Sequence, residues 1–349
     1  MPNRVFCEDI EQIISDPHLP WHEMSNKSVL ITGATGLIGT ALAFALSAAS
    51  QKYQLNLSLI GNGRDSVKGE RLTKDCGLDA FISGDIRRPL TMEALPGKLD
   101  YIFHCAAITR SADMVAKPVD VITTAVDGTR NILELAKERD SKSVVYLSSM
   151  EVYGQNLHGQ VQEADLGYLD LYNPRSSYSE SKRLCESLCT AYAVQYGLPV
   201  KVARLAQVFG AGTPKADTRV FAQFARSAMA GENIILHTEG KTRGNYCYLA
   251  DAVRGLLSLL LRGLNGQAYN IANQEASTTI REMAEMVASE ICQGRIKTVV
   301  EIPSDIAKRG YAPEVGFRLN ADKLKSLGWR PQYGLADMYR RMILDWQGK

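Results

Sequence analysis

The residues with the clearest chemistry are a tyrosine and a lysine four positions apart, Tyr178 and Lys182, in the segment YSESK. On a helix, this spacing places both side chains on one face, where the ammonium favours ionisation of the phenol. Because an unperturbed phenol has a pKa of about 10, Tyr178 needs that help to act as a base. Ser149, at the end of a predicted strand, can hydrogen-bond the same substrate hydroxyl. The three side chains predict a hydride-transfer site; the alternative for the tyrosine and lysine is a surface pair.

A glycine-rich turn, TGATGLIG at 32–39, lies far upstream of these residues. It follows a predicted strand and opens a predicted helix, so the backbone can approach a pyrophosphate and the helix N-terminus can point at its charge. The alternative is a tight strand-to-helix turn without a ligand. The turn predicts a nicotinamide dinucleotide, which we expect to be held by residues at the ends of successive strands: Gly33, Thr35, Gly36, Leu37, Ile38, Arg64, Asp85, Ile86, Ala106, Ala107 and Lys182.

The end of the second predicted strand, IGNGRD at 60–65, bears on the choice between NAD and NADP. An NAD-selective site usually places an acid there, on the ribose hydroxyls, and no carboxylate stands directly at this strand end. Arg64 could instead meet a 2′-phosphate, and Asp65 lies one position late. We expect NAD and leave NADP open. Asp85, after the third strand, either accepts from the adenine amine or caps a helix.

The elements that must position these residues alternate along the chain. Buried apolar runs predict strands at 29–32 and 55–60, and an alanine- and leucine-rich stretch predicts a helix at 40–49. Further strands are predicted at 80–83, 101–106, 144–148 and 200–205, and later helices at 220–230, 250–262 and 280–291. This rhythm is typical of an α/β fold with a doubly wound parallel sheet of the Rossmann type.

The predicted organisation has three parts. Residues 1–26 form an N-terminal extension, expected to cover one edge of the fold with a short helix and a loop. Residues 27–210, with a return segment at about 244–273, form the dinucleotide-binding domain. A smaller α/β lobe, residues 211–243 and 274–349, is expected to bind the substrate. No long linker separates the lobes, so we expect them to pack around a cleft.

Composition excludes several classes of partner. In 349 residues the formal net charge is only +2 and is scattered, so we expect no nucleic-acid partner. No apolar run is long enough to span a bilayer and the start opens no signal peptide, so the expectation is no membrane partner and a cytoplasmic location. Seven cysteines without a CxxC pair, and five histidines without ligand spacing, predict reduced thiols and no metal site.

Two further motifs, HCAA at 104–107 and LSSMEVYG at 147–154, stand in order between the glycine turn and YSESK. With them, the chain from about residue 27 to 346 resembles the extended short-chain dehydrogenase family, most of whose members modify nucleotide-linked sugars. The resemblance implies a bound nicotinamide cofactor, a nucleoside-diphosphate sugar as substrate, and a homodimer formed through the helices that carry Tyr178 and residues 126–139. It also implies that His104 lines the cofactor path.

The two residues after Ser149 bear on the reaction. The 4,6-dehydratases of the family resemble one another in carrying an Asp-Glu pair where this chain has Met150 and Glu151. Methionine cannot donate a proton, which argues against a straightforward dehydratase. The glutamate is retained, as in UDP-glucuronate decarboxylases, which implies a base or a sugar-hydroxyl acceptor. The alternative for Glu151 is a hydrogen-bonded structural acid.

Candidate substrate contacts are also implied by the resemblance. Arg219 and Arg243 would face the diphosphate, since a guanidinium fork matches phosphate oxygens; the alternative for each is a surface salt bridge. Gln207 stands where the family commonly has an asparagine at the diphosphate. Ala125 stands where the family often has another asparagine, which puts an asparagine-assisted proton relay in doubt.

The leading hypothesis is an enzyme that takes a hydride from the sugar of a nucleoside-diphosphate sugar, at C4, and later returns it. Epimerisation, decarboxylation and dehydration share this first step. The second hypothesis is a reductase that uses NADPH on a nucleotide-linked keto sugar or polyol precursor. A third, non-enzymatic reading is a cofactor-sensing scaffold, which would not need Ser149, Tyr178 and Lys182 together.

Overall fold

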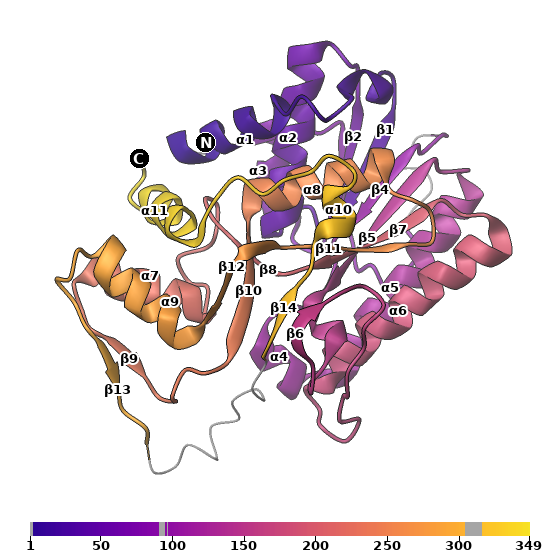
Figure 1. The fold of residues 1–349 in the computed structure, drawn as a ribbon. Coiled ribbons are helices and arrows are strands. Elements are labelled where there is room, and N and C mark those ends of the chain that lie inside the picture. The colour runs from indigo at the N-terminus through magenta and orange to yellow at the C-terminus, as the bar shows by residue number, and fades with distance from the viewer. Residues whose placement is uncertain (1–2, 91–94, 96, 304–315) are drawn as a thin grey trace.

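A parallel seven-stranded sheet forms the centre of the molecule in the computed structural model, which describes residues 3–90, 95, 97–303 and 316–349 (Figure 1). Its strand order is β11-β7-β5-β4-β1-β2-β3, and every neighbouring pair is parallel. The order reverses beside β1, which makes the doubly wound topology. The strands are β1 (Ser28–Thr32), β2 (Ser58–Gly63), β3 (Ala80–Ser83), β4 (Tyr101–His104), β5 (Ser143–Ser149), β7 (Val200–Leu205) and β11 (Ala268–Ile271).

Helices cover both faces of this sheet because its strands are apolar on both sides. In β1, Val29 and Ile31 belong to the core shared with α2 and α8, whereas Leu30 belongs to the core shared with α5 and α6. A parallel sheet buried in this way has no face left for solvent. The helices of this domain are α2 (Leu37–Tyr53), α3 (Ser66–Cys76), α4 (Ser111–Ala116), α5 (Pro118–Glu138), α6 (Ser176–Tyr196) and α8 (Leu249–Arg262).

A smaller lobe lies to one side of the carboxyl ends of the strands (Figure 1). It contains a three-stranded sheet of order β12-β10-β8 and two parallel pairs, β13 with β9 and β14 with β6. Its strands are β6 (His158–Val161), β8 (Gln207–Phe209), β9 (Ile234–Leu236), β10 (Arg243–Tyr248), β12 (Asn273–Thr279), β13 (Thr298–Val300) and β14 (Gly316–Leu319). Its helices are α7 (Val220–Ala230), α9 (Ile280–Met286), α10 (Asp322–Lys325) and α11 (Leu335–Trp346).

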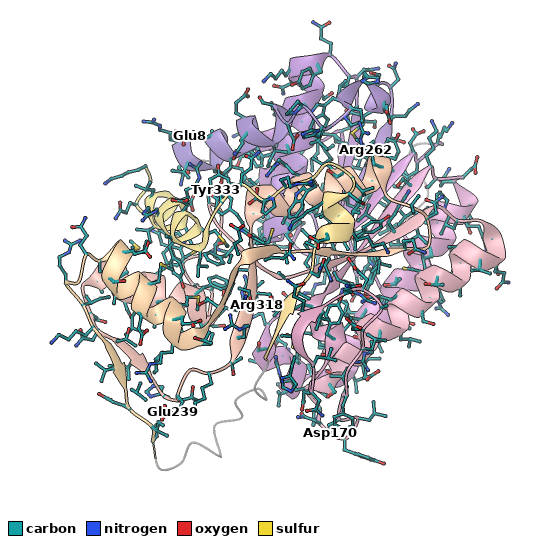
Figure 2. The ribbon with its side chains drawn as sticks, viewed as in Figure 1. Glu8, Asp170, Glu239, Arg262, Arg318 and Tyr333 are labelled. Carbon is teal, nitrogen blue, oxygen red and sulfur yellow. The ribbon has the colours of Figure 1, made fainter. Side chains whose placement is uncertain are left out.

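The N-terminal segment folds as helix α1 (Arg4–Ile14) and a short 3₁₀ turn, Trp21–Met24. Helix α1 packs against α2, α8 and α11. The buried carboxylate of Asp9 accepts a hydrogen bond from the hydroxyl of Tyr248 at 2.5 Å and forms an ion pair with Arg341 at 2.7 Å. The ring of Tyr333 is tilted against that of Tyr248, with 4.3 Å between the ring centres, and its hydroxyl donates to Gln12 of the same helix (Figure 2). The extension is therefore an integral part of the fold.

The predicted α/β class and doubly wound sheet are confirmed, with local differences at several ends. Helix α2 is longer than expected, and β2 begins and ends later than the predicted 55–60. The predicted helix at 280–291 is α-helical only to Met286 and ends in a π-helical turn, Val287–Ile291. In the return segment, β11 joins the central sheet, but β10 belongs to the small sheet. The domain boundaries as such stay a prediction.

Candidate active site

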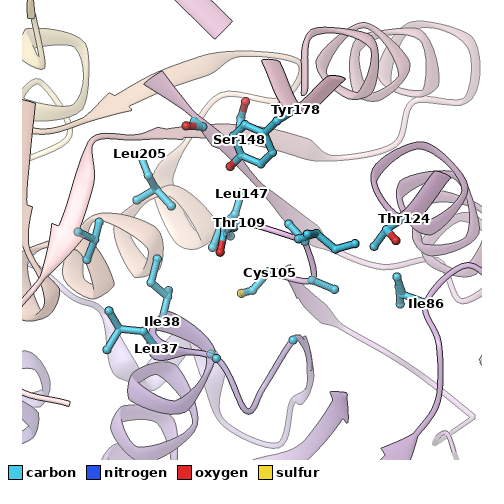
Figure 3. Close-up of a pocket in the computed structure, with 18 of the residues that line it drawn as sticks. Leu37, Ile38, Ile86, Cys105, Thr109, Thr124, Leu147, Ser148, Tyr178 and Leu205 are labelled. Atoms are coloured by element: carbon cyan, nitrogen blue, oxygen red, sulfur yellow. The ribbon is translucent and has the colours of Figure 1, made fainter. Parts of the chain in front are cut away.

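A cavity with a volume of ≈ 500 Å³ opens at the carboxyl ends of β1, β2, β4 and β5. This edge, beside the reversal of strand order, is where α/β sheets bind ligands. Figure 3 shows Leu37 and Ile38 from the start of α2 on one side, Cys105 near the middle, and Ser148 and Tyr178 on the far side. The cavity thus joins the glycine turn to the predicted catalytic residues.

The glycine turn fits a pyrophosphate sterically. Gly33 adopts φ 62°, and a Cβ there would lie 2.9 Å from the Cα of Ala106, so both conformation and space require glycine. At Gly39 a Cβ would lie 2.8 Å from the Cα of Ala34, which lets α2 pack directly on the turn. Gly36 caps α2 without any side-chain hydrogen bond, and Leu37 and Ile38 line the cavity. The first N–H groups of α2 are thus left for an anion.

The adenosine end of the cavity contains Arg64, Asp85 and Ile86. Asp85 is partly engaged, since one of its oxygens accepts the backbone N–H of Arg87 at 3.0 Å and the other pairs with the guanidinium of Arg87 at 2.6 Å. These bonds hold the pKa of Asp85 below its usual range. Asp65 does not line the cavity; it caps α3 by accepting from the backbone N–H of Lys68.

Ser149, Tyr178 and Lys182 come together as the sequence predicts. Ser149 and Tyr178 line the cavity, whereas Lys182 lies buried behind the tyrosine, with only 3% of its surface exposed. The ammonium of Lys182 donates to the carbonyl of Leu147 at 2.7 Å and lies 5.8 Å from the Tyr178 ring centre. A lysine thus reaches the phenol from inside the protein, leaving the cavity side of the ring to ligands.

Burial sets the electrostatics of this pair. It raises the pKa of Tyr178; the charge of Glu151 raises it further, while a hydrogen bond with Ser149 and the charge of Arg219 lower it. Burial also lowers the pKa of Lys182. The net effect is a raised pKa for the phenol, because burial and Glu151 outweigh the opposing effects of Ser149 and Arg219. A cation bound in the cavity would shift the balance toward phenolate.

Glu151 lines the cavity beside Tyr178 and is held by two side chains of α6 and its entry turn. Arg175 pairs with it at 3.4 Å, and the hydroxyl of Ser179 donates to it at 3.4 Å. Met150 also lines the cavity. Arg175 was missed as a site residue by sequence reasoning, although its place three positions before Tyr178, on the same helical face, was the available signal.

Of the three residues predicted to contact the diphosphate, Gln207 and Arg219 line the cavity. Arg219 is paired with Asp217 at 2.6 Å and lies over the ring of Phe221, with its carbon Cζ 4.6 Å from the ring centre. Arg243 does not line this cavity; it donates to the carbonyl of Ser277 at 3.1 Å and is largely buried at the start of β10.

His104 does not line the cavity, contrary to the expectation from the family. It is 2% exposed, between the hydroxyls of Thr32 at 2.8 Å and Thr129 at 3.3 Å, because β4 ends at this residue with its side chain turned into the sheet. Burial, aided by the charge of Lys182, lowers its pKa to about 3. The ring is therefore neutral and structural at neutral pH.

A largely buried network of hydrogen bonds and an ion pair holds the end of β5, the strand that carries Ser148 and Ser149. Ser148 donates to Glu186 at 2.5 Å, and Glu186 forms a two-pronged ion pair with Arg204 at 2.7 Å. Arg204 also donates to the hydroxyl of Tyr153 at 3.1 Å. These bonds join the end of β5, helix α6 and β7, so they fix the position of Ser149 relative to Tyr178.

All seven cysteines are free thiols. Among the residues that the structure describes, no group of three or more histidine, cysteine, aspartate or glutamate side chains is arranged to hold a metal ion. Within the same residues, none of the helices combines the length and the apolar character that crossing a bilayer requires.

Comparison with known proteins agrees with this site. The model of the "NAD dependent epimerase/dehydratase family" matches residues 29–272. The chain is 31% identical over 317 residues to UDP-glucuronic acid decarboxylase 6 of Arabidopsis thaliana, covering 90% of this chain and 87% of the relative. It is 32% identical over 309 residues to UDP-N-acetyl-alpha-D-glucosaminuronate decarboxylase of Bacillus cytotoxicus, covering 86% and 91%.

Solved structures share the fold. An epimerase from Methanothermobacter thermautotrophicus superposes with a TM-score of 0.77 at 24% identity, covering 94% of both chains. A dTDP-glucose 4,6-dehydratase from Streptomyces venezuelae, solved with NAD bound, gives a TM-score of 0.73 at 23% identity and covers 92% of this chain and 97% of its own. The chain belongs to the NAD-dependent epimerase/dehydratase family, and it is an enzyme whose cofactor is NAD.

Proposed function

We propose that the enzyme decarboxylates a nucleoside-diphosphate hexuronic acid through transient oxidation at C4 of the sugar. The observation that carries this proposal is the composition of the reacting end of the cavity. The described residues that line it beside Ser149 and Tyr178 include one carboxylate, Glu151, which is paired with Arg175, and Met150 stands where a proton donor would be. Loss of CO₂ does not need an acid on the leaving group, whereas loss of water does.

The chain's own residues have defined tasks in this reaction. Tyr178, as phenolate, takes the proton of the C4 hydroxyl, and Ser149 donates to the same oxygen as the carbonyl forms. NAD, when bound, would supply the acceptor for the C4 hydride and the hydride that restores the alcohol. With C4 as a ketone, the carboxylate at C6 is β to a carbonyl, so the C5–C6 bond breaks, CO₂ leaves and the electron pair is delocalised toward the C4 oxygen. A proton then adds at C5 and Tyr178 returns its proton to the C4 oxygen as the alcohol re-forms, so no net oxidation remains.

Positive charge in the cavity supports an anionic substrate. Arg175 and Arg219 both line it, and each already holds a carboxylate of the protein, at 3.4 Å and 2.6 Å. In the proposed complex, Arg219 contacts the diphosphate with Gln207, and Glu151 accepts from a sugar hydroxyl. The two relatives named above decarboxylate uronic acids, which agrees with this assignment.

The test is mass spectrometry of the products formed from UDP-glucuronic acid and UDP-N-acetylglucosaminuronic acid, with UDP-glucose and dTDP-glucose as neutral-sugar controls. We expect loss of the mass of CO₂ from one acid, with no net change in reduced-cofactor absorbance. Loss of the mass of water from a neutral sugar would establish a dehydratase and overturn the proposal. An isomer of unchanged mass would establish an epimerase, and stoichiometric consumption of NADPH a reductase.

We also propose that the enzyme is a homodimer formed through α5 and α6. These helices pack on each other and expose apolar side chains: Val119 (71%) and Ile122 (42%) on α5, and Leu184 (53%) and Val194 (82%) on α6. Such side chains on adjacent helices suit a second copy of the same surface. Analytical ultracentrifugation of the wild type and of Leu184→Glu tests this; a wild-type monomer at micromolar concentration would exclude it.

We infer a cytoplasmic location from the cysteines. Five of the seven free thiols are buried, including Cys185 and Cys189 one turn apart on α6, and none is bridged. An oxidising compartment usually pairs such residues. Fractionation of the producing cells, with an antibody to the chain, tests the location; recovery outside the cytoplasm would contradict it.

A further inference from the structure

Lys182 is a buried cation that lacks an acidic partner within the described chain. It is 3% exposed, and its ammonium donates to the carbonyl of Leu147 at 2.7 Å. The acid one turn later on the same helix, Glu186, is instead held in an ion pair by Arg204 at 2.7 Å. A buried charge usually requires a partner, because burial removes its hydration. One carbonyl oxygen replaces only part of that hydration.

The ring of Tyr146 lies where an acidic partner would otherwise be needed. Because side chains alternate along β5, Tyr146 belongs to the core shared with α5 and α6, whereas Leu147 belongs to the core on the other face of the sheet. The ammonium of Lys182 lies 4.7 Å from the centre of the Tyr146 ring and 5.8 Å from that of Tyr178. Both distances are within the reach of a cation–π contact, about 6 Å.

The surroundings of this contact are dry and carry little other charge. Tyr146 is 2% exposed, and a cation–π contact strengthens when water is excluded. Burial raises the pKa of the thiols of Cys105 and Cys189, so both stay neutral, as the buried imidazole of His104 does. The titratable side chains that face the ammonium come from three strands and helices: Tyr146 of β5, His104 and Cys105 at the end of β4, and Tyr178, Cys185, Glu186 and Cys189 of α6.

The hydroxyl of Tyr146 does not account for the presence of this residue. It lies near the thiol of Cys185 but forms no hydrogen bond of normal geometry with any described residue. A buried hydroxyl without a partner weakens a core, so a purely structural position would favour phenylalanine or leucine. The contacts of Tyr146 are made by its ring, and the charged group among them is Lys182.

We propose that Tyr146 is a positioning residue of the hydride-transfer site, whose ring face holds the charged ammonium of Lys182 beside the phenol of Tyr178. A carboxylate in this place would also stabilise the ammonium, but its negative charge would oppose the ionisation of the phenol. An aromatic face stabilises the cation without adding a charge. This role belongs to the hydride transfer itself, so it does not depend on the proposed decarboxylation.

The test is the titration of Lys182, followed by nuclear magnetic resonance of enzyme labelled with carbon-13 at the lysine Cε atoms, without any sugar nucleotide. The signal that is missing from Lys182→Arg identifies the residue. Tyr146→Phe keeps the ring, so we expect the ratio of ammonium to amine at a given pH to change less than about twofold. Tyr146→Leu removes the ring, so we expect that ratio to fall about tenfold, as the pKa of Lys182 falls.

A third variant separates the electrons of the ring from its packing. Trifluorophenylalanine, incorporated at position 146, keeps the shape of phenylalanine but withdraws electron density from the ring face, so the ratio should fall as it does in Tyr146→Leu. The control is Tyr339→Leu, which removes an equally buried tyrosine of the smaller lobe. The hydroxyl of Tyr339 is also unpartnered within the described residues, and its ring contacts that of Phe209. This variant should leave the titration of Lys182 unchanged.

Two results would overturn the proposal. One is a trifluorophenylalanine variant that titrates like Tyr146→Phe, which would mean that the ring only fills space. The other is an equal fall of the ratio in Tyr146→Phe and Tyr146→Leu, which would assign the effect to the hydroxyl. Thermal unfolding of each variant checks that the fold is retained. If Tyr146→Leu does not fold, the comparison of the two phenylalanine variants still decides, because they differ little in shape.

Discussion

The buried imidazole of His104 should make folding sensitive to acid. In the folded chain its pKa is about 3, because burial between Thr32 and Thr129 and the nearby charge of Lys182 disfavour the cation. In the unfolded chain the ordinary value is about 6.5. Below that value the unfolded state binds a proton that the folded state refuses, so stability falls as pH falls from about 6.5 toward 3.

The size of the effect follows from the two values. At pH 5 an exposed imidazole is about thirtyfold more protonated than neutral, and the buried one is almost entirely neutral, so the loss relative to pH 7 is about 2 kcal/mol. His104→Gln removes this titration. We expect the free energy of unfolding of the variant, measured by urea titration, to fall about 2 kcal/mol less between pH 7 and pH 5 than that of the wild type.

The dependence of the free energy of unfolding on pH separates the titration of His104 from its packing. His104→Gln also disturbs the two threonine contacts, which lowers stability at every pH but does not change the slope. His158→Gln is the control, because it removes an exposed imidazole on β6 that water reaches in the folded and unfolded chain alike. Equal slopes in the wild type and His104→Gln would refute the argument that a neutral buried histidine causes the acid sensitivity.

Three further outcomes are expected. Gly33→Ala should weaken NAD binding about tenfold or more in a fluorescence titration, whereas Gly77→Ala, which bears the same left-handed strain with nothing within 4 Å of the new Cβ, should not. Tyr178→Phe should lower turnover about a hundredfold or more while the affinity for NAD stays within about twofold; near-normal turnover would exclude the tyrosine as the base. Arg204→Met, which leaves the largely buried Glu186 without its ion-pair partner, should lower the free energy of unfolding by about 3 kcal/mol in urea, and a loss under about 1 kcal/mol would show that the pair is solvated.

Local spacing accounts for the parts of the site that the sequence predicts. The glycine turn and the start of α2 are adjacent in the chain, so their geometry is largely a matter of backbone conformation. Tyr178 and Lys182 share a face because one helix carries both. The doubly wound sheet follows from strands and helices that alternate at ordinary lengths.

Contacts between segments that lie far apart in the sequence could not be predicted from local spacing. The sequence contains Glu151 and Arg175, but only the packing of α6 against the end of β5 brings them into contact. Arg243 was expected at the diphosphate because of its motif, and the pairing of β10 with β12 places it against Ser277. His104 was expected to line the cavity from the resemblance to the family, but the sequence does not show to which face the last side chain of β4 turns.

The two ends of the described chain meet, and this sets an order on folding. Asn3 donates to the backbone carbonyl of Asp345 at 2.8 Å, and the two termini lie on the same side of the molecule (Figure 1). A ribosome adds roughly 5–20 residues per second, so helix α1, which can pack on α2 at once, waits on the order of half a minute for its contacts with α11. The contacts that join α1 to α11 are therefore among the last native contacts that can form during synthesis.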